Sequence, residues 1–209
     1  LQPKAIKVLY MTENHPAFSE IEERKRIDYY YQRHRIKVPL ERSGLFYKKE
    51  HLSTRYDFVV ALGEVEFFQP QYEKPYAIFP TGILNPEYVQ KGKDHNSTRK
   101  HFLWLGSSAV IHKGLDLLLD IFSLRDDVTL HICGLNNESR RKLIIRKRAN
   151  IIDYGHVNIN SRQFLDIVYS CSFSILPSCS EGMATSITTS MLHGLIPVVL
   201  SNSGFNRLG

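Results

Sequence analysis

The sequence predicts an α/β fold in two parts, because both halves of the chain alternate short apolar runs with segments of helical period. From about His101 onward, short apolar runs alternate with segments of helical period, as in a parallel sheet with crossover helices. Residues 1–92 show the same pattern on a smaller scale, and a polar run at 91–100 separates the halves as a linker. We therefore expect part of one α/β domain at 1–92, and a second at 93–209 that is truncated at its C-terminus.

The first part is expected to contain three strands and a long helix. Short apolar runs predict strands at 6–12, 56–63 and 76–80. Ser19 and Glu22 have the spacing of a capping box, which predicts that the helix begins there and runs through 24–33. A short helical piece is expected around 65–68.

The second part is expected to contain five strands connected by helices. Apolar residues recur at i, i+3, i+4 and i+7 over 115–122 and again over 164–171, so each segment is predicted to pack one helical face on a sheet. Residues 185–190 have strand-like propensity, and only their place between two strands favours a helix. The strands are predicted at 102–106, 128–134, 151–155, 173–177 and 197–201.

The composition is that of a soluble globular protein. With 209 residues, of which 43% are hydrophobic and 23% charged, the chain can form one good core or two modest ones. No apolar stretch approaches the ~20 residues of a membrane span, and no signal segment opens the sequence. Because it starts at Leu1 and ends at Gly209, just after a strand-like run, we expect it to be cut from a longer protein. Three cysteines without CxxC spacing indicate neither a disulfide framework nor a zinc site; a cytoplasmic location fits best.

The net charge of +6 is concentrated in one segment, since six Lys and Arg residues lie within 140–148. We expect this segment to be helical. One interpretation is a solvated helix face above partly buried Leu143, Ile144 and Ile145. The other is a patch attracted to anionic lipid at the inner face of a membrane, or to a phosphate-bearing acceptor. No aromatic-interleaved basic motif accompanies the patch, so we expect no nucleic-acid partner.

A carboxylate, a glycine and several small residues follow the fourth strand of the second part, at 178–185. Because this position is the carboxyl end of a buried strand, Glu181 would lie beside the unpaired backbone N–H groups that open the next helix. The carboxylate suits sugar hydroxyls, and the N–H groups suit phosphate. This pattern favours a ligand in which a sugar carries a phosphate.

A second pattern lies at 102–119, where a glycine ends a strand and Lys113 with Gly114 opens a helix. Lys113 would add a mobile positive charge to the helix dipole, and together they can neutralise a leaving diphosphate. A surface lysine near a helix cap would need no function. The two patterns in series, each between a strand and a helix, favour the functional interpretation.

These two motifs resemble those of retaining glycosyltransferases of the GT-B fold, in particular glycosyltransferase family 4 (group 1). The resemblance is strong over 102–204 and loose over the first half. It implies a Rossmann-like nucleotide-sugar domain at 93–209, preceded by the end of an acceptor-side α/β domain. Glu181, Lys113 and His15 would be catalytic. The implied donor-binding residues are Gly106, Ser107, Lys113, Tyr154, Gly155, Glu181, Gly182, Met183, Ala184, Thr185 and Thr189.

The resemblance assigns a role to several of these residues. Glu181 would accept hydrogen bonds from the donor sugar, Lys113 would stabilise the leaving nucleoside diphosphate, and the amides of 182–185 would face the sugar and phosphate. The loop after 151–155 would hold the base, largely through backbone atoms. His15 follows the first strand, as in the family loop that places a histidine near the reacting sugar, although a turn histidine before a proline needs no function.

Two positions depart from the family pattern. The family usually has a second glutamate eight positions after the first, and this chain has Thr189 there. One uncharged hydroxyl in place of a carboxylate could cost on the order of 1–3 kcal/mol of donor binding. Ser107 replaces the arginine expected after the first-strand glycine, and the spacing to Lys113 is one residue longer. Either the donor is held differently in this subgroup, or the site has lost activity.

The resemblance implies transfer of a sugar from a nucleoside-diphosphate sugar to a hydroxyl acceptor, a glycan or lipid-linked glycan, with retention at the anomeric carbon. It also implies a bacterial role in surface polysaccharide or lipopolysaccharide synthesis. Such chemistry depends on positioning and leaving-group stabilisation, so we expect no cofactor and no metal. A non-catalytic nucleotide-sugar or carbohydrate-binding module and a sugar-nucleotide epimerase of the same fold remain alternatives. A dinucleotide-binding dehydrogenase does not, because the loop after 102–106 lacks GxGxxG.

Overall fold

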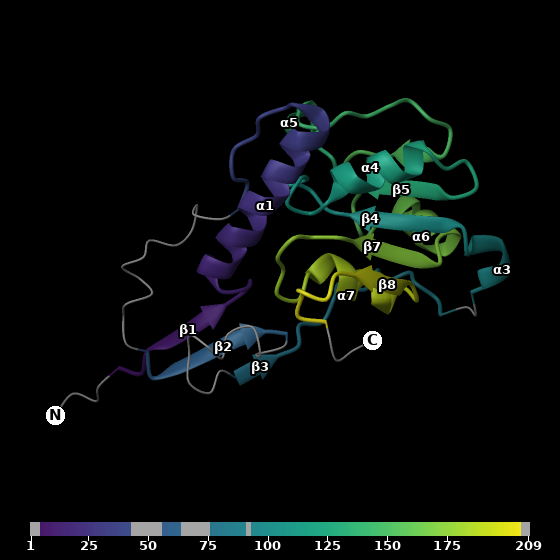
Figure 1. The fold of residues 1–209 in the computed structure, drawn as a ribbon. Helices are drawn as coiled ribbons and strands as arrows, with labels where there is room; N and C mark the ends of the chain where they lie inside the picture. The colour runs from purple at the N-terminus through teal and green to yellow at the C-terminus, as the bar shows by residue number, and fades with distance from the viewer. Residues whose placement is uncertain (1–4, 43–55, 64–75, 91–92, 206–209) are drawn as a thin grey trace.

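The computed structural model describes residues 5–42, 56–63, 76–90 and 93–205 and contains two parallel sheets (Figure 1). The smaller sheet has the order β1 (Val8–Met11), β2 (Phe58–Leu62), β3 (Tyr76–Ile78). The larger sheet has the order β6-β5-β4-β7-β8. Its strands are β4 (His101–Leu105), β5 (Thr129–Cys133), β6 (Ile151–Asp153), β7 (Phe173–Leu176) and β8 (Ile196–Val199).

All eight predicted strands are present, with ends that differ from the prediction by at most two residues. The expected helix around 65–68 lies outside the described residues, as do residues 91 and 92, at which the predicted domain boundary falls. That boundary stays a prediction.

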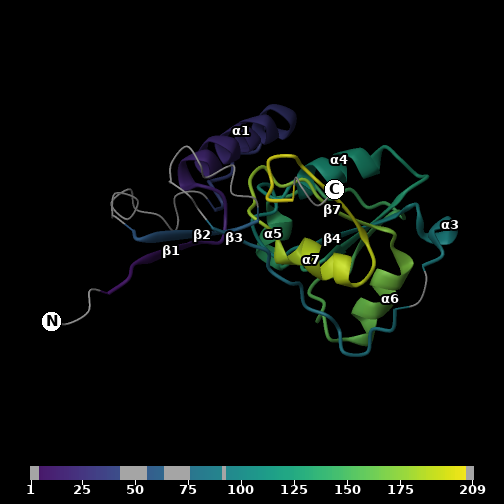
Figure 2. The same ribbon diagram turned by 90° about the horizontal axis from the view of Figure 1, so that it is seen from below.

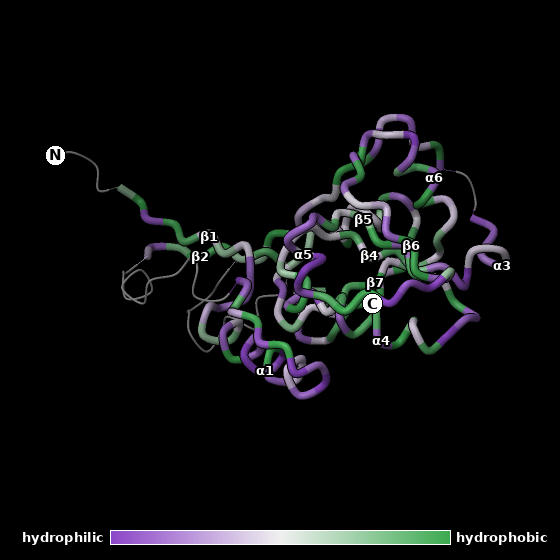
Figure 3. Tube along the Cα trace, turned by 90° about the horizontal axis from the view of Figure 1, so that it is seen from above, coloured by the Kyte–Doolittle hydropathy of each residue, from purple (hydrophilic) through white to green (hydrophobic). Residues whose placement is uncertain are grey.

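Helices cover both faces of the larger sheet because its strands alternate between two apolar clusters. Trp104 points to the cluster that contains α4 (Leu115–Ser123), whereas Leu103 points to the cluster that contains α6 (Arg162–Ser170). Figure 2 shows α4 and α6 on opposite sides of the sheet. In Figure 3, hydrophobic segments lie along the central strands and hydrophilic ones lie around α3 (His95–Thr98). This arrangement is the one expected of a parallel sheet covered by helices on both faces.

The long helix α1 (Pro16–His34) follows β1 of the smaller sheet and packs against the second part of the chain. It begins near the end of β1 and extends toward α4 (Figure 1). Tyr30 is fully buried in the core of the larger sheet, and its hydroxyl donates to the carbonyl of Lys142 at 2.6 Å. Arg33 pairs with Asp116 and Asp120 of α4. The helix is therefore anchored in the second part of the chain, although its sequence belongs to the first.

The predicted start of α1 is wrong. The helix begins at Pro16, three residues before Ser19, and His15 is its N-cap through a bond from the Ala17 amide to Nδ1. Proline at the first helical position has a φ suited to the helix and loses no hydrogen bond there. Ser19 lies inside the helix, where its hydroxyl pairs with that of Ser180 at 2.7 Å.

The basic segment 140–148 is not one helix, in contrast to the prediction. Helix α5 (Asn137–Arg141) ends before most of it. The tertiary contacts of the next residues override helix propensity: Leu143 is buried in the core, and the carbonyl of Lys142 accepts the hydroxyl of Tyr30. The charges are also partly paired, since Arg140 binds Asp153 at 2.7 Å and Lys142 binds Glu41 at 3.3 Å.

The predicted linker is partly structured. Its residues 95–98 form α3, capped by Asp94, and Lys93 donates to the carbonyls of Val168 and Cys171. The C-terminal helix α7 (Thr185–Leu192) is confirmed despite its strand-like sequence. The hydroxyls of Thr188 and Ser190 donate to carbonyls of the preceding turn, so these polar groups are satisfied within the helix. Among the described residues, no helix is both long and apolar enough to cross a membrane.

The N-cap of α6 offers a direct test of how local sequence supports this fold. The hydroxyl of Ser161 accepts from the amide of Phe164 at 3.2 Å. Ser161→Ala is expected to lower the free energy of unfolding by about 1 kcal/mol, since an unpaired N-terminal amide remains. Ser161→Asn is the control, because asparagine also caps helices and should retain most of the stability. Urea unfolding measures both, and equal losses in the two variants would contradict the capping role.

Candidate functional site

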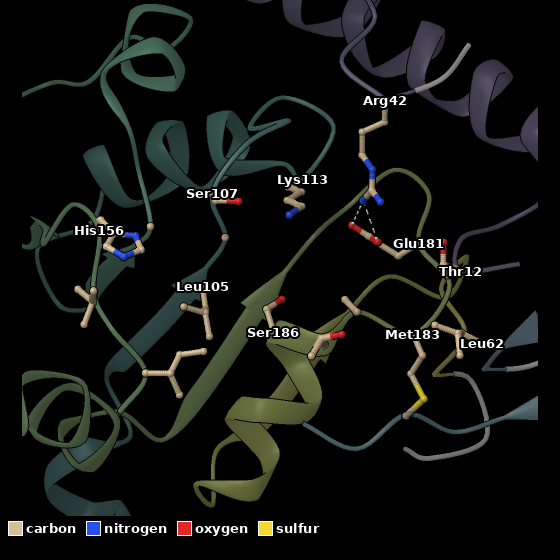
Figure 4. Close-up of a pocket in the computed structure, with 16 residues that line it drawn as sticks. Thr12, Arg42, Leu62, Leu105, Ser107, Lys113, His156, Glu181, Met183 and Ser186 are labelled. Atoms are coloured by element: carbon tan, nitrogen blue, oxygen red, sulfur yellow. Dashed lines mark hydrogen bonds and ion pairs between the residues drawn. The ribbon is translucent and has the colours of Figure 1, made fainter. Parts of the chain in front are cut away.

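A pocket of about 510 Å³ lies at the carboxyl edge of the larger sheet. Its floor comes from the ends of β4 and β5, which supply Gly106, Ser107 and Gly134. Thr12 and Leu62, from the ends of β1 and β2, line the opposite side (Figure 4). The site is thus formed where both sheets present the carboxyl ends of their strands, the usual place for a ligand in open α/β sheets.

The floor of the pocket requires a glycine at position 134. Gly134 has φ +104°, and a Cβ there would lie 1.7 Å from the carbonyl oxygen of Gly106. Only glycine allows this approach without strain. Its amide donates to the carbonyl of Gly155 at 2.6 Å, which joins the loops that follow β5 and β6. The backbone around the pocket is therefore held close together.

Glu181 lines one side of the pocket, in the loop between β7 and α7 (Figure 4). Its side chain is 8% exposed. The Nη1 of Arg42 donates to both of its carboxylate oxygens, at 3.0 and 3.1 Å, and the hydroxyl of Ser178 donates to Oε1 at 3.2 Å. Arg42 also pairs through Nη2 with Glu13 at 2.8 Å. Burial alone would lower the pKa of Arg42, but these two carboxylates raise it above its usual value, so the guanidinium stays charged.

Lys113 faces the same pocket from the loop that follows β4 (Figure 4). Gly114 comes next as the N-cap of α4, with φ +68°. Burial is the main cause that lowers the pKa of Lys113; nearby Arg42 also lowers it, whereas Glu181 raises it. An anionic ligand in the pocket would offset the burial penalty on this ammonium.

Seven of the predicted donor-site residues line the pocket. They come from the loop after β4 and from the segment between β7 and α7, two regions that are about 70 residues apart in sequence but adjacent in the fold. These residues are Gly106, Ser107, Lys113, Glu181, Met183, Ala184 and Thr185. Gly182 lies just behind them, where an added Cβ would be 3.1 Å from the carbonyl oxygens of Leu62 and Thr12.

Tyr154 does not line the pocket. Its ring stacks on that of His131, and its hydroxyl lies 2.9 Å from the Nδ1 of the same histidine. Burial, with a smaller effect of His101, lowers the pKa of His131 to about 4, so this imidazole is neutral. Gly155 is likewise absent from the lining. The loop after β6 reaches the pocket through His156, Val157 and Ile159 instead, one residue beyond the predicted pair.

Thr189 and His15 also lie outside the pocket lining. The hydroxyl of Thr189 accepts from the amide of Ile83 at 2.9 Å, so it holds the segment that follows β3. His15 caps α1, and burial lowers its pKa. The structure therefore gives both residues structural contacts, and their predicted roles toward a donor stay predictions.

A buried ion pair supports the pocket wall from behind. The side chains of Glu23 and His112 are fully buried, and His112 Nδ1 lies 3.3 Å from Glu23 Oε1. Burial alone would lower the pKa of His112, but its contacts with Cys179 and Glu23 raise it to about 10. The imidazolium donates through Nε2 to the carbonyl of Ser180 at 2.7 Å, directly before Glu181.

Arg42, Glu23 and His112 are absent from the sequence prediction. They lie far apart in the chain, and no local motif marks them. The only available signal was that each is a charged or titratable residue, which does not distinguish a buried group from a solvated one.

One family model and several solved structures match this chain. The family model described as "Glycosyl transferases group 1" matches residues 99–208, more than half of the chain. No curated protein sequence matches significantly.

Several solved structures resemble this fold over most of the chain. A mutant of S. aureus TarM, in complex with fondaparinux, alpha-GlcNAc-glycerol and UDP, aligns with a TM-score of 0.58 at 15% identity, over 95% of this chain and 37% of that one. Anabaena Alr3699/HepE in complex with UDP-glucose aligns with a TM-score of 0.55 at 15% identity, over 78% and 52%. The lipopolysaccharide outer core galactosyltransferase WaaB aligns with a TM-score of 0.52 at 13% identity, over 69% and 43%.

At these identities the likeness shows the fold alone, which is of the GT-B type. The present chain spans between about a third and about half of the length of these three proteins.

Proposed function

The chain belongs to the group 1 glycosyl transferases, and on this premise we propose that it transfers a sugar from a nucleoside-diphosphate sugar to a hydroxyl acceptor. The observation that carries the proposal is the meeting of Lys113 and Glu181 in one pocket, at the carboxyl edge of a parallel sheet. The ammonium suits a diphosphate, and the carboxylate suits sugar hydroxyls. A ligand that carries both a diphosphate and a sugar could contact Lys113 and Glu181 at the same time.

The N-terminus of α7 adds neutral donors to this site. Ala184 is its N-cap and makes no side-chain capping bond, while Ala184, Thr185 and Ser186 line the pocket. The first amides of a helix have no partner within the helix and carry partial positive charge. We propose that these amides face the donor phosphate and that Lys113 stabilises the diphosphate as it leaves.

We propose a uridine nucleotide as the donor. UDP or UDP-glucose is bound in the structures of TarM and HepE. In this chain, the loop with His156, Val157 and Ile159 forms the side of the pocket away from Glu181 (Figure 4), so we assign the base to this loop and the sugar to Glu181.

The finer assignments follow from the sequence motifs. We propose membership of glycosyltransferase family 4, retention at the anomeric carbon, and a glycan or lipid-linked glycan as acceptor, held by residues 1–92. The galactosyltransferase WaaB is named for the lipopolysaccharide outer core, which supports a bacterial role in surface polysaccharide synthesis.

A peripheral membrane contact through 140–148 fits the same role. Arg141, Arg146, Lys147 and Arg148 are exposed, and Ile144 and Ile145 beside them are 41% and 37% exposed. Exposed cations with adjacent apolar side chains suit an anionic lipid surface. We propose this segment as the contact with the cytoplasmic face of a membrane.

Lys113→Ala tests the diphosphate site. The variant is expected to bind UDP about 10- to 100-fold more weakly, because a charged hydrogen bond contributes about 1.5–3 kcal/mol. Its melting temperature should stay nearly unchanged, since burial of an ammonium does not favour the folded state. Titration calorimetry measures the affinity, and Lys147→Ala, which removes an exposed lysine, is the control. Equal UDP affinity in wild type and Lys113→Ala would remove Lys113 from the site.

A non-catalytic nucleotide-sugar-binding module is the second candidate. Among the described residues that line the pocket, Glu181 is the one carboxylate, and Thr189 uses its hydroxyl to hold Ile83. Tight binding of UDP-glucose without any transfer or hydrolysis would favour this module.

A further inference from the structure

Arg42 connects the first part of the chain to the pocket. It follows α1 in sequence and is separated from Glu181 by 139 residues. Its guanidinium lies between two carboxylates, Glu13 after β1 and Glu181 after β7. Figure 4 shows its side chain descending from the α1 side toward Glu181. The two carboxylates balance its charge, so Arg42 adds little net attraction for an anion.

The backbone of Arg42 is held from two sides. The amides of Glu41 and Arg42 donate to Glu23 Oε1 of α1, at 2.8 and 2.9 Å. The carboxylate of Glu41 in turn accepts from the amides of Ile111 and His112, at 2.9 and 3.0 Å. Residues 111 and 112 directly precede Lys113. The position of the guanidinium is therefore fixed relative to both the helix and the lysine loop.

The contact of Arg42 with both oxygens of Glu181 determines how the carboxylate lies. An ionised carboxylate accepts about four hydrogen bonds. Arg42 takes one on each oxygen, and Ser178 takes another on Oε1. Acceptor capacity therefore remains on Oε2. Because Arg42 and Ser178 hold the carboxylate from two sides, this remaining capacity has a defined direction.

We propose that Arg42 is a positioning residue that orients Glu181 toward the hydroxyls of the donor sugar. The inference rests on the proposed function, since it requires a sugar at Glu181. It gives the first part of the chain, through Arg42, a role in recognising the donor sugar, in addition to any role in binding the acceptor. Arg42 acts through Glu181 and not on the phosphates, which Lys113 and the α7 amides face.

Calorimetry with two probes, UDP and UDP-glucose, tests this inference on the 209-residue chain. The wild type is expected to bind UDP-glucose more tightly than UDP. In Arg42→Gln, the affinity for UDP-glucose should fall about 10-fold while the affinity for UDP stays within about twofold. Arg42→Lys should restore part of the difference, because an ammonium keeps a positive charge at Glu181 but lacks the second nitrogen, with which Arg42 also binds Glu13. Arg141→Gln, which removes an exposed arginine, is the matched control.

The outcomes separate this inference from the proposed function. If the wild type binds neither probe, the proposed function fails and the inference fails with it. If the wild type prefers UDP-glucose and Arg42→Gln keeps the same preference, the inference alone is overturned. Equal losses for UDP and UDP-glucose would overturn it as well, because Arg42 would then contact the diphosphate. Arg42→Lys gives the same distinction if the glutamine variant does not fold.

Discussion

Glu181→Gln is expected to lower the affinity for UDP-glucose by about 10- to 100-fold while leaving the affinity for UDP nearly unchanged. Glutamine keeps the volume of the side chain but loses the charge that strengthens its bonds to sugar hydroxyls. The nucleotide should still be held by Lys113 and by the amides of α7. In a transfer assay, turnover should fall by about 100-fold or more, because the sugar is no longer held in the reacting position.

Glu138→Gln is the control for this substitution, since it also neutralises a glutamate, but one whose side chain is 80% exposed. The rival explanation is that Glu181 caps the helix that follows. The structure gives that position to Ala184, which makes no side-chain capping bond. A variant with lower melting temperature and an unchanged ratio of UDP-glucose to UDP affinity would favour a structural role for Glu181.

The strands were predictable from the sequence because each lies in a short apolar run, and most of these runs are bounded by polar, glycine or proline residues. The five-strand order with β4 in the middle was not predicted, because parallel crossovers alone do not decide that β7 pairs with β4 and not with β6. Helix α7 was predictable only from its place between β7 and β8, since its propensity favours a strand. The pocket residues after β4 and β7 could be named in advance from their motifs and the family resemblance, and they meet because the loops follow the carboxyl ends of adjacent parallel strands.

The features that the sequence did not predict depend on contacts between residues far apart in the chain. The helix expected at 140–148 ends at Arg141. Beyond it, the carbonyl of Lys142 accepts a hydrogen bond from the hydroxyl of Tyr30, and Leu143 is buried in the core. Tyr154 was predicted to bind the donor, but its hydroxyl lies 2.9 Å from His131 of the neighbouring strand. The pairing of Arg42 with Glu181 joins positions that no periodicity relates. Each outcome depends on which side chains the tertiary fold brings together, which local pattern does not encode.

The largest effect on stability is expected at the buried pair of Glu23 and His112. Both side chains are fully buried, and Glu23 also accepts the amides of Glu41 and Arg42. Glu23→Ala would leave a buried imidazolium and these two amides without that acceptor. Removing one partner of such a pair costs about 3–5 kcal/mol of unfolding free energy. Glu20→Ala, in the same helix and in an exposed pair with Arg24, is the control and should cost less than about 1 kcal/mol.

The same pair predicts how stability changes with pH. The titratable neighbours of His112 are Glu23, which lies on α1, and Cys179 and Glu181, which lie in the loop after β7. The pKa of His112 in the folded state is raised to about 10 from a usual value of 6.5. Between these values the folded state holds a proton that the unfolded state has lost. The contribution of His112 is therefore complete below pH 6.5 and is lost as the pH rises toward 10.

Wild-type stability should fall over this window by roughly 1 kcal/mol per pH unit from His112 alone. His112→Gln should remove that slope, whereas Glu20→Ala should keep it. Urea unfolding at pH 6, 7, 8 and 9 measures the slope in all three proteins. If His112→Gln kept the wild-type slope, the imidazole of His112 would be neutral in the folded state. The hydrogen bond from His112 to the carbonyl of Ser180 would then position the Glu181 loop as a neutral contact.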